Sequence, residues 1–120
     1  MKWRVIPLSI NDCATNMAID EAIQESVAMG GPPTIRFYRW NPSAVSIGYF
    51  QCLHDEVDIE KCNSKGIGIV RRRTGGGAVF HDFNGEITYS IIASELLYSK
   101  DISKSYVEIS LTSFFSTAST

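Results

Sequence analysis

Apolar residues recur along this chain with two periodicities, the spacing of about four residues typical of a helix and the alternation typical of a strand. Ile19, Ile23 and Val27 lie four residues apart, which places them on one face of a helix. Polar residues from Asn11 onward can cap the start of this helix, and the Gly-Gly-Pro-Pro sequence at 30–33 predicts its end. We therefore predict one long helix that ends before residue 30.

Shorter apolar runs on either side of this helix predict strands. The expected strands are residues 3–8, 34–40, 44–50, 67–72, 78–80 and 86–93, and two further helices are expected at 55–65 and 103–110. Hairpins mixed with helices predict an α+β fold with a mixed or largely antiparallel sheet flanked by helices. The apolar strand residues are assigned to the core, namely Trp3, Ile35, Phe37, Val45, Ile47, Ile69, Val70, Ile87, Tyr89 and Ile91.

Composition narrows the class of protein. The chain has 120 residues, 44% of them apolar, which predicts one globular domain with a real core. The net charge of −2 argues against a general nucleic-acid binder. Three widely spaced cysteines give no disulfide framework, and we expect no signal peptide and no membrane span. The expected location is the cytoplasm.

The largest concentration of candidate functional residues lies where the strand predicted at 67–72 ends. Arg71, Arg72 and Arg73 precede Thr74 and the three glycines at 75–77. Glycines let a ligand approach the backbone, and their N–H groups can form an anion-binding concavity beside arginine forks. Three glycines alone are more often a flexible turn, and three arginines alone are usually a solvated face. The combination matches neither a Walker loop nor a Rossmann fingerprint, so both interpretations remain open on physical grounds.

The segment at 71–82, Arg-Arg-Arg-Thr-Gly-Gly-Gly-Ala-Val-Phe-His-Asp, resembles the lipoate–protein ligase family of the biotin/lipoate ligase superfamily. Residues 16–22, 36–40, 48–51 and 86–90 also resemble that family. The similarity extends from about residue 3 to about residue 93. It implies that residues 1–120 are the N-terminal portion of a lipoate-ligase catalytic domain.

The resemblance also implies a reaction. Family members join lipoate to ATP with Mg²⁺ to form lipoyl-AMP, and then transfer the lipoyl group to a lysine of a carrier domain. The expected partners are the lipoyl domains of 2-oxoacid dehydrogenases or the glycine cleavage H protein, and a separate C-terminal accessory domain. No nucleic acid and no membrane is expected as a partner.

Site residues follow from the resemblance by position. The expected nucleotide-binding residues are Arg72, Gly77, Ala78, Val79 and Phe80. The expected lipoate- or adenylate-binding residues are Trp40, Arg72, Gly75, Gly76 and His81. Trp40 is expected to flank the entry to the apolar tunnel for the lipoyl chain. No metal site is expected, because the Cys and His spacings match no zinc pattern.

The chain departs from the family downstream of the loop. The family's catalytic lysine has no counterpart, because neither Lys100 nor Lys104 has the matching strand context. We expect the chain to be C-terminally truncated, and residues 110–120, rich in Ser and Thr, to form a frayed tail. Two alternatives therefore remain, octanoyl transfer from an acyl carrier without ATP and a non-catalytic lipoyl- or nucleotide-binding module. Gly77, where cysteine-type octanoyltransferases tend to have arginine, favours the ligase.

Other reactive residues have ordinary explanations. Cys52 and Cys62 are expected to be packed or partly exposed thiols. His81 is expected to anchor the loop or face the ligand, and adjacent Asp82 should point to the opposite face of the strand. The carboxylates of Asp20 and Glu21 are assigned to a solvated helix face.

Overall fold

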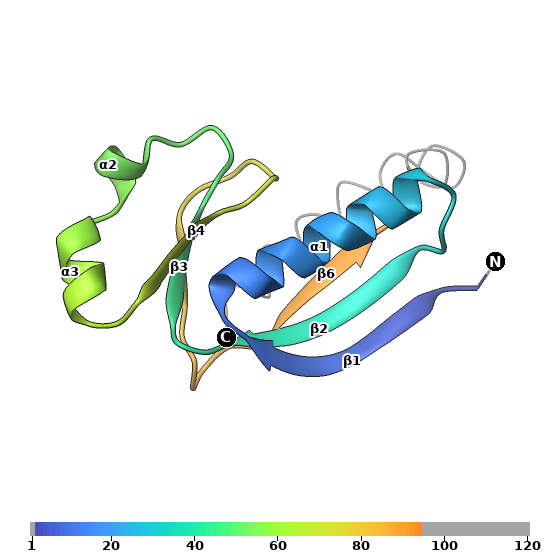
Figure 1. Cartoon of the computed structure of the whole chain (residues 1–120), viewed down its shortest axis with the longest axis horizontal. Coiled ribbons are helices and arrows are strands. Elements are labelled where there is room, and N and C mark those ends of the chain that lie inside the picture. The colour runs from blue at the N-terminus through green and yellow to red at the C-terminus, as the bar shows by residue number, and fades with distance from the viewer. Residues whose placement is uncertain (1, 95–120) are drawn as a thin grey trace.

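The computed structural model describes residues 2–94 and shows two three-stranded sheets with the long helix α1 lying along one of them (Figure 1). The strands are β1 (Arg4–Asn11), β2 (Thr34–Trp40), β3 (Ala44–Ile47), β4 (Gly68–Arg71), β5 (Val79–His81) and β6 (Thr88–Ile92). The helices are α1 (Cys13–Ala28), α2 (Leu53–Glu56) and α3 (Ile59–Ser64). The helix expected at 103–110 and the tail at 110–120 lie outside the described residues.

Both sheets are mixed, as the order of elements predicted. In the first sheet, β2 pairs with β1 in parallel and with β6 in antiparallel orientation. In the second sheet, β3 pairs with β4 in parallel and with β5 in antiparallel orientation. The α+β class is therefore confirmed, with the strands divided between two small sheets.

Helix α1 begins and ends where the polar and glycine signals predicted. The Asp12 carboxylate accepts a hydrogen bond from the backbone N–H of Thr15 at 2.7 Å, which caps the first turn. After Met29 the chain turns at Gly30, whose φ of 97° favours glycine. Ile23 and Val27 are buried, so the predicted helix and its apolar face are confirmed.

The buried face of β2 is the opposite of the one expected. Arg36, Tyr38 and Trp40 are buried, whereas Phe37 is 37% exposed. Alternation predicts which residues share a face but not which face the helix covers. The polar face lies beneath α1 because Asp20 of that helix pairs with Arg36 at 2.8 Å. The assignments of Phe37 to the core and of Asp20 to a solvated face were therefore wrong.

Several large apolar residues in the strands of the first sheet, or next to them, are exposed. They are Trp3, Val5, Leu8, Ile10, Phe37 and Ile87. Of these, Trp3, Phe37 and Ile87 had been assigned to the core. Trp3 and Ile87 therefore also depart from the predicted core, because α1 packs against the other side of this sheet.

Two predicted boundaries also change. The helix expected at 55–65 is two short helices, because Val57 is extended and the Asp58 carboxylate caps a new helix at Lys61 N (3.1 Å). The strand expected at 44–50 ends at Ile47. A Cβ on Gly48 would overlap the carbonyl oxygen of Gly76, so the chain must turn here with glycine to let the loop approach.

Candidate functional site

The glycine-rich loop is held against the end of β3. Arg72 N donates to Ile47 O at 2.9 Å, which extends the β3–β4 pairing by one residue. Tyr49 N donates to Thr74 O at 2.9 Å on the other side of the turn. Together with the close approach of Gly48 to Gly76, these contacts place the loop across the end of the second sheet.

The two outer arginines of the cluster are engaged by neighbouring groups. The Arg71 guanidinium donates to Tyr49 O at 2.9 Å and to Gln51 O at 2.7 Å. Arg73 forms an ion pair with Glu21 of α1, and both side chains are largely exposed. These two arginines therefore fasten the segment after β3 and the loop to the body of the protein.

Arg72 occupies a different environment. Its Nη1 donates to Ser46 O at 3.1 Å and to Ser46 Oγ at 2.8 Å, and its Nη2 donates to Gly75 O at 3.1 Å and Gly77 O at 2.7 Å. All four acceptors are neutral, and within residues 2–94 no carboxylate pairs with Arg72. Burial lowers the pKa of Arg72 below its usual range. The site thus contains a partly desolvated positive charge that an anion or a developing oxyanion would stabilise.

The three glycines of the loop differ in whether their backbone conformation favours glycine. Gly76 has a φ of 100°, a conformation that favours glycine. A Cβ on Gly75 or Gly77 would meet nothing within 4 Å, and neither has a left-handed φ. The fold therefore requires glycine at 76, while the glycines at 75 and 77 leave open space beside the backbone.

Beneath the loop lies a buried cluster of polar side chains. His81 Nε2 lies 2.7 Å from Ser46 Oγ, and His81 Nδ1 lies 2.9 Å from Glu86 Oε1. Trp40 stacks on the His81 ring with centroids 3.9 Å apart, and its Nε1 donates to Thr88 Oγ1 at 2.9 Å. The cluster has the connectivity of a Ser–His–acid triad, but Ser46 has no exposed surface, so an acyl carbonyl cannot reach its hydroxyl.

The structure separates the predicted site residues into two layers. The upper layer is the exposed loop, which contains Gly75, Gly76, Gly77 and Ala78. The partly buried side chain of Arg72 donates to backbone carbonyl oxygens of this loop. Trp40 and His81 lie in the buried layer below. Contact of these two side chains with lipoate stays a prediction.

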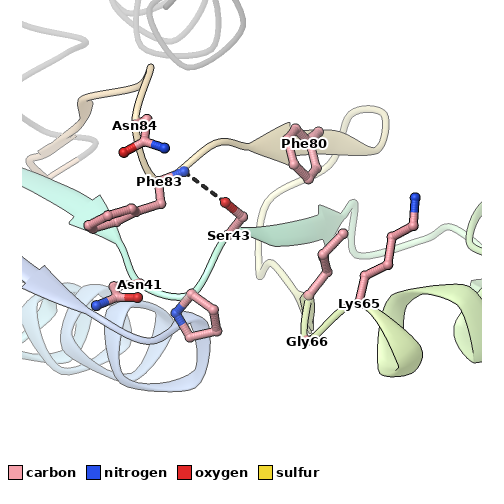
Figure 2. Close-up of a pocket in the computed structure, with 9 residues that line it drawn as sticks. Asn41, Ser43, Lys65, Gly66, Phe80, Phe83 and Asn84 are labelled. Atoms are coloured by element: carbon pink, nitrogen blue, oxygen red, sulfur yellow. Dashed lines mark hydrogen bonds between the residues drawn. The ribbon is translucent and has the colours of Figure 1, made fainter.

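The remaining predicted nucleotide residues lie on β5. Val79 pairs with Ser46 of β3, and Phe80 is exposed, on the face of the strand opposite His81. Asp82 is exposed while His81 is buried, which confirms that the two do not cooperate. Phe80 lines an open hollow of about 440 Å³ with Ser43, Lys65 and Phe83, shown in Figure 2. None of the three clustered arginines lines that hollow.

Four residues of this site were not predicted as site residues: Ser46, Gly48, Glu86 and Thr88. Ser46 gives one sequence signal, as a polar residue within an otherwise apolar strand. Glu86 gives another, as a carboxylate just before a strand and five positions after a histidine.

The cysteines agree with the expectation of packed or partly exposed thiols. All three cysteines are free; Cys52 is exposed, and Cys62 is partly buried. Among residues 2–94, no three His, Cys, Asp or Glu side chains are grouped so that they could hold a metal ion. In the same part of the chain, no helix is long and apolar enough to cross a membrane.

Comparison with known proteins places this site in a family context. The family model described as the lipoyl protein ligase A/B catalytic domain matches residues 12–112. Octanoyltransferase LipM of Moorella thermoacetica is 51% identical over 94 residues, which is 78% of this chain and 34% of that protein. Octanoyltransferase LipM of Clostridioides difficile is 51% identical over 112 residues, 91% of this chain and 41% of that protein. The chain thus spans well under half the length of the curated relatives it matches.

Solved structures of similar fold include lipoate ligases. A lipoate-protein ligase A bound with ATP superposes with a TM-score of 0.70 and 40% identity, covering 79% of this chain and 38% of that one. A bi-partite lipoate protein ligase from Thermoplasma acidophilum, studied with its E2 lipoyl domain, gives a TM-score of 0.67 and 41% identity, covering 79% and 37%. The two sets of relatives differ in the reaction that they are named for.

Proposed function

The chain belongs to the lipoyl protein ligase A/B catalytic domain family, and we therefore propose that its described part forms the acyl-binding portion of a site that transfers an octanoyl group to a lipoyl carrier domain. In this reaction the amine of the acceptor lysine attacks the carbonyl carbon of a donor thioester. A C–N bond forms, the C–S bond breaks, and the thiol leaves with the proton given up by the amine. The carbonyl oxygen carries negative charge as the transition state forms.

The single observation that carries this proposal is the uncompensated charge of Arg72 behind an open glycine backbone. Arg72 has only neutral oxygen partners among the described residues. The fold does not require glycine at positions 75 and 77, and the absence of a side chain there leaves open space beside the backbone. A reactive carbonyl could approach the loop there, and the fixed positive charge of Arg72 would stabilise its oxyanion without reorganisation.

Two further observations favour the thioester donor. The curated relatives in the comparison are octanoyltransferases at 51% identity, and they do not support the inference that Gly77 indicates a ligase. Arg73 is also paired with the Glu21 carboxylate. That ion pair leaves less cationic surface for a triphosphate than the cluster of three arginines suggested.

An ATP-dependent lipoate ligase is the second candidate function. The observation that favours it is 40% identity to a ligase whose structure contains ATP. On this alternative, Gly77, Ala78, Val79 and Phe80 would bind the nucleotide largely through their backbone, and Arg72 would face the acyl phosphate. The described residues near the loop offer no carboxylate cluster for Mg²⁺, so no metal-dependent step is assigned to them.

Acyl transfer to a purified lipoyl domain tests the proposal. The chain is incubated with an octanoyl carrier-protein thioester and, separately, with octanoate or lipoate plus ATP and Mg²⁺. Modification of the lipoyl domain is followed by mass spectrometry, and ATP–pyrophosphate exchange is measured alongside. Transfer from the thioester without ATP supports octanoyl transfer, whereas exchange and transfer that require ATP support the ligase. No transfer from either donor, by this chain or by a version extended to the length of its relatives, contradicts both and favours a binding module.

A further inference from the structure

We propose that Glu86, His81 and Ser46 form a buried positioning relay that sets the orientation of Arg72 and, through it, of the glycine loop. The relay begins at the Glu86 carboxylate, crosses the His81 ring and the Ser46 hydroxyl, and ends on Arg72. Its contact distances are 2.9, 2.7 and 2.8 Å in that order. Its value for acyl transfer rests on the function proposed above, whereas its geometry does not.

The groups at the two ends of the relay define its polarity. Arg72 can only donate, so Ser46 Oγ accepts from it. The Glu86 carboxylate can only accept, so His81 Nδ1 carries a proton and donates to it. An unprotonated Nδ1 would set two acceptors against each other. In the bond between His81 Nε2 and Ser46 Oγ either atom can be the donor.

A second arm converges on the same carboxylate. Trp40 Nε1 donates to Thr88 Oγ1 at 2.9 Å, and Thr88 Oγ1 donates to Glu86 Oε1 at 2.7 Å. Trp40 also stacks on His81 at 3.9 Å, which limits rotation of the imidazole ring. Both arms hold Glu86 and His81 in place, so contacts other than the one with Ser46 already determine the orientation of the histidine ring.

The interior of the relay is closed to water. Ser46, His81 and Glu86 are 0%, 2% and 3% exposed, so solvent cannot replace a partner that is lost. The outer end lies on the loop, where the Arg72 guanidinium holds the carbonyls of Gly75 and Gly77. A change at Glu86 should therefore be transmitted to Arg72, although the two side chains do not touch.

A positioning role and a nucleophilic role would require different environments for the Ser46 hydroxyl. A serine nucleophile needs an exposed hydroxyl and a free approach for a carbonyl. Ser46 has no exposed surface, and its oxygen already accepts from Arg72. Ser46, His81 and Glu86 are thus positioning residues that act through Arg72.

Nitrogen-15 NMR of the 120-residue chain tests the relay without any ligand. Glu86→Gln keeps the shape of the side chain and removes its charge. It should shift the His81 ring nitrogens and also accelerate hydrogen exchange at the Arg72 Nη groups by about tenfold, the factor expected for losing part of a charge-assisted hydrogen bond. Ser46→Ala removes a single oxygen and should produce the same Arg72 change if Glu86→Gln does not fold. Ser43→Ala is the matched control, because Ser43 Oγ accepts from Phe83 N at 2.8 Å outside the relay, and should leave Arg72 unchanged.

A folded Glu86→Gln chain in which only the His81 nitrogens shift, with Arg72 exchange unchanged, would overturn the relay. If Glu86→Gln does not fold, unchanged Arg72 exchange in Ser46→Ala would overturn it. The affinity for octanoyl-pantetheine separates this inference from the proposed function. We expect Ser46→Ala and Arg72→Gln each to weaken binding by about tenfold, with no further loss when combined. If Arg72→Gln leaves the affinity unchanged while the NMR transmission persists, the relay stands and the proposed acyl site fails.

Discussion

Removal of the Asp20 carboxylate should strongly destabilise the domain. Asp20 accepts from Arg36 Nη1 at 2.8 Å, Tyr38 Oη at 3.1 Å and Ser90 Oγ at 2.9 Å, and Arg36 is fully buried. Breaking a buried ion pair on one side typically costs about 3–5 kcal/mol. Arg36 would keep two contacts to Asn16, at 3.0 and 2.7 Å, so we expect Asp20→Ala to lower the free energy of unfolding by about 3 kcal/mol. Urea denaturation followed by tryptophan fluorescence measures the difference.

Glu21→Ala provides the matched control for this experiment. Glu21 is the next residue of the same helix, and its ion pair with Arg73 is largely exposed, so its loss should cost less than about 1 kcal/mol. Equal losses for the two variants would refute the reasoning. They would mean that the polar face of β2 does not depend on Asp20 for its burial.

Other predictions concern the loop, the core and alkaline pH. Gly48→Ala should destabilise the chain by about 1–3 kcal/mol because its Cβ meets the loop backbone. Gly75→Ala should change stability by less than about 0.5 kcal/mol, and equal effects in thermal melts would contradict this difference. Trp40→Phe should cost about 1–3 kcal/mol in urea, because the buried indole donor to Thr88 is lost. Burial, followed by the nearby Asp20 charge, raises the pKa of Tyr38 well above its ordinary value. The folded state therefore resists ionisation, and stability should fall above about pH 10, where the unfolded tyrosine ionises. A Tyr38→Phe variant that declines just as steeply in urea titrations would refute that assignment.

The elements that could be predicted from sequence are those set by local signals. Helix α1 has a capping carboxylate, apolar residues four apart and a glycine stop, so it follows from neighbouring residues alone. The break between α2 and α3 was missed, although Asp58 carries a capping signal of the same kind. Residues 55–65 contain too few apolar positions to distinguish one helix from two.

The buried face of β2 could not be predicted because it depends on a partner distant in sequence. Ile35 and Phe37 alternate with Arg36 and Tyr38, and hydrophobicity alone places the isoleucine and phenylalanine inside. The carboxylate that makes burial of Arg36 acceptable lies sixteen residues earlier, on α1. Pairing of this kind is decided by tertiary packing, which no local pattern reports.

The candidate site also has one part that local sequence signals predict and one part that depends on contacts between residues distant in sequence. The arginine and glycine segment was identified from residues adjacent in the chain. The network beneath it joins Ser46 to His81 across 35 positions of the sequence. Ser46 is a polar residue within an apolar strand, but this local pattern does not report which side chain it contacts.

Chemical-shift mapping of the backbone amides and the Arg72 guanidinium with octanoyl-pantetheine reports where an acyl thioester binds, whether or not the chain is catalytically active. The largest shifts should lie at residues 75–78 and at the Arg72 guanidinium, and Arg72→Gln should remove them while Lys61→Gln on α3 should not. Shifts centred on the hollow beside Phe80 and Phe83, or no saturable shifts at all, would contradict the assignment of the glycine loop and Arg72 as the acyl-binding site.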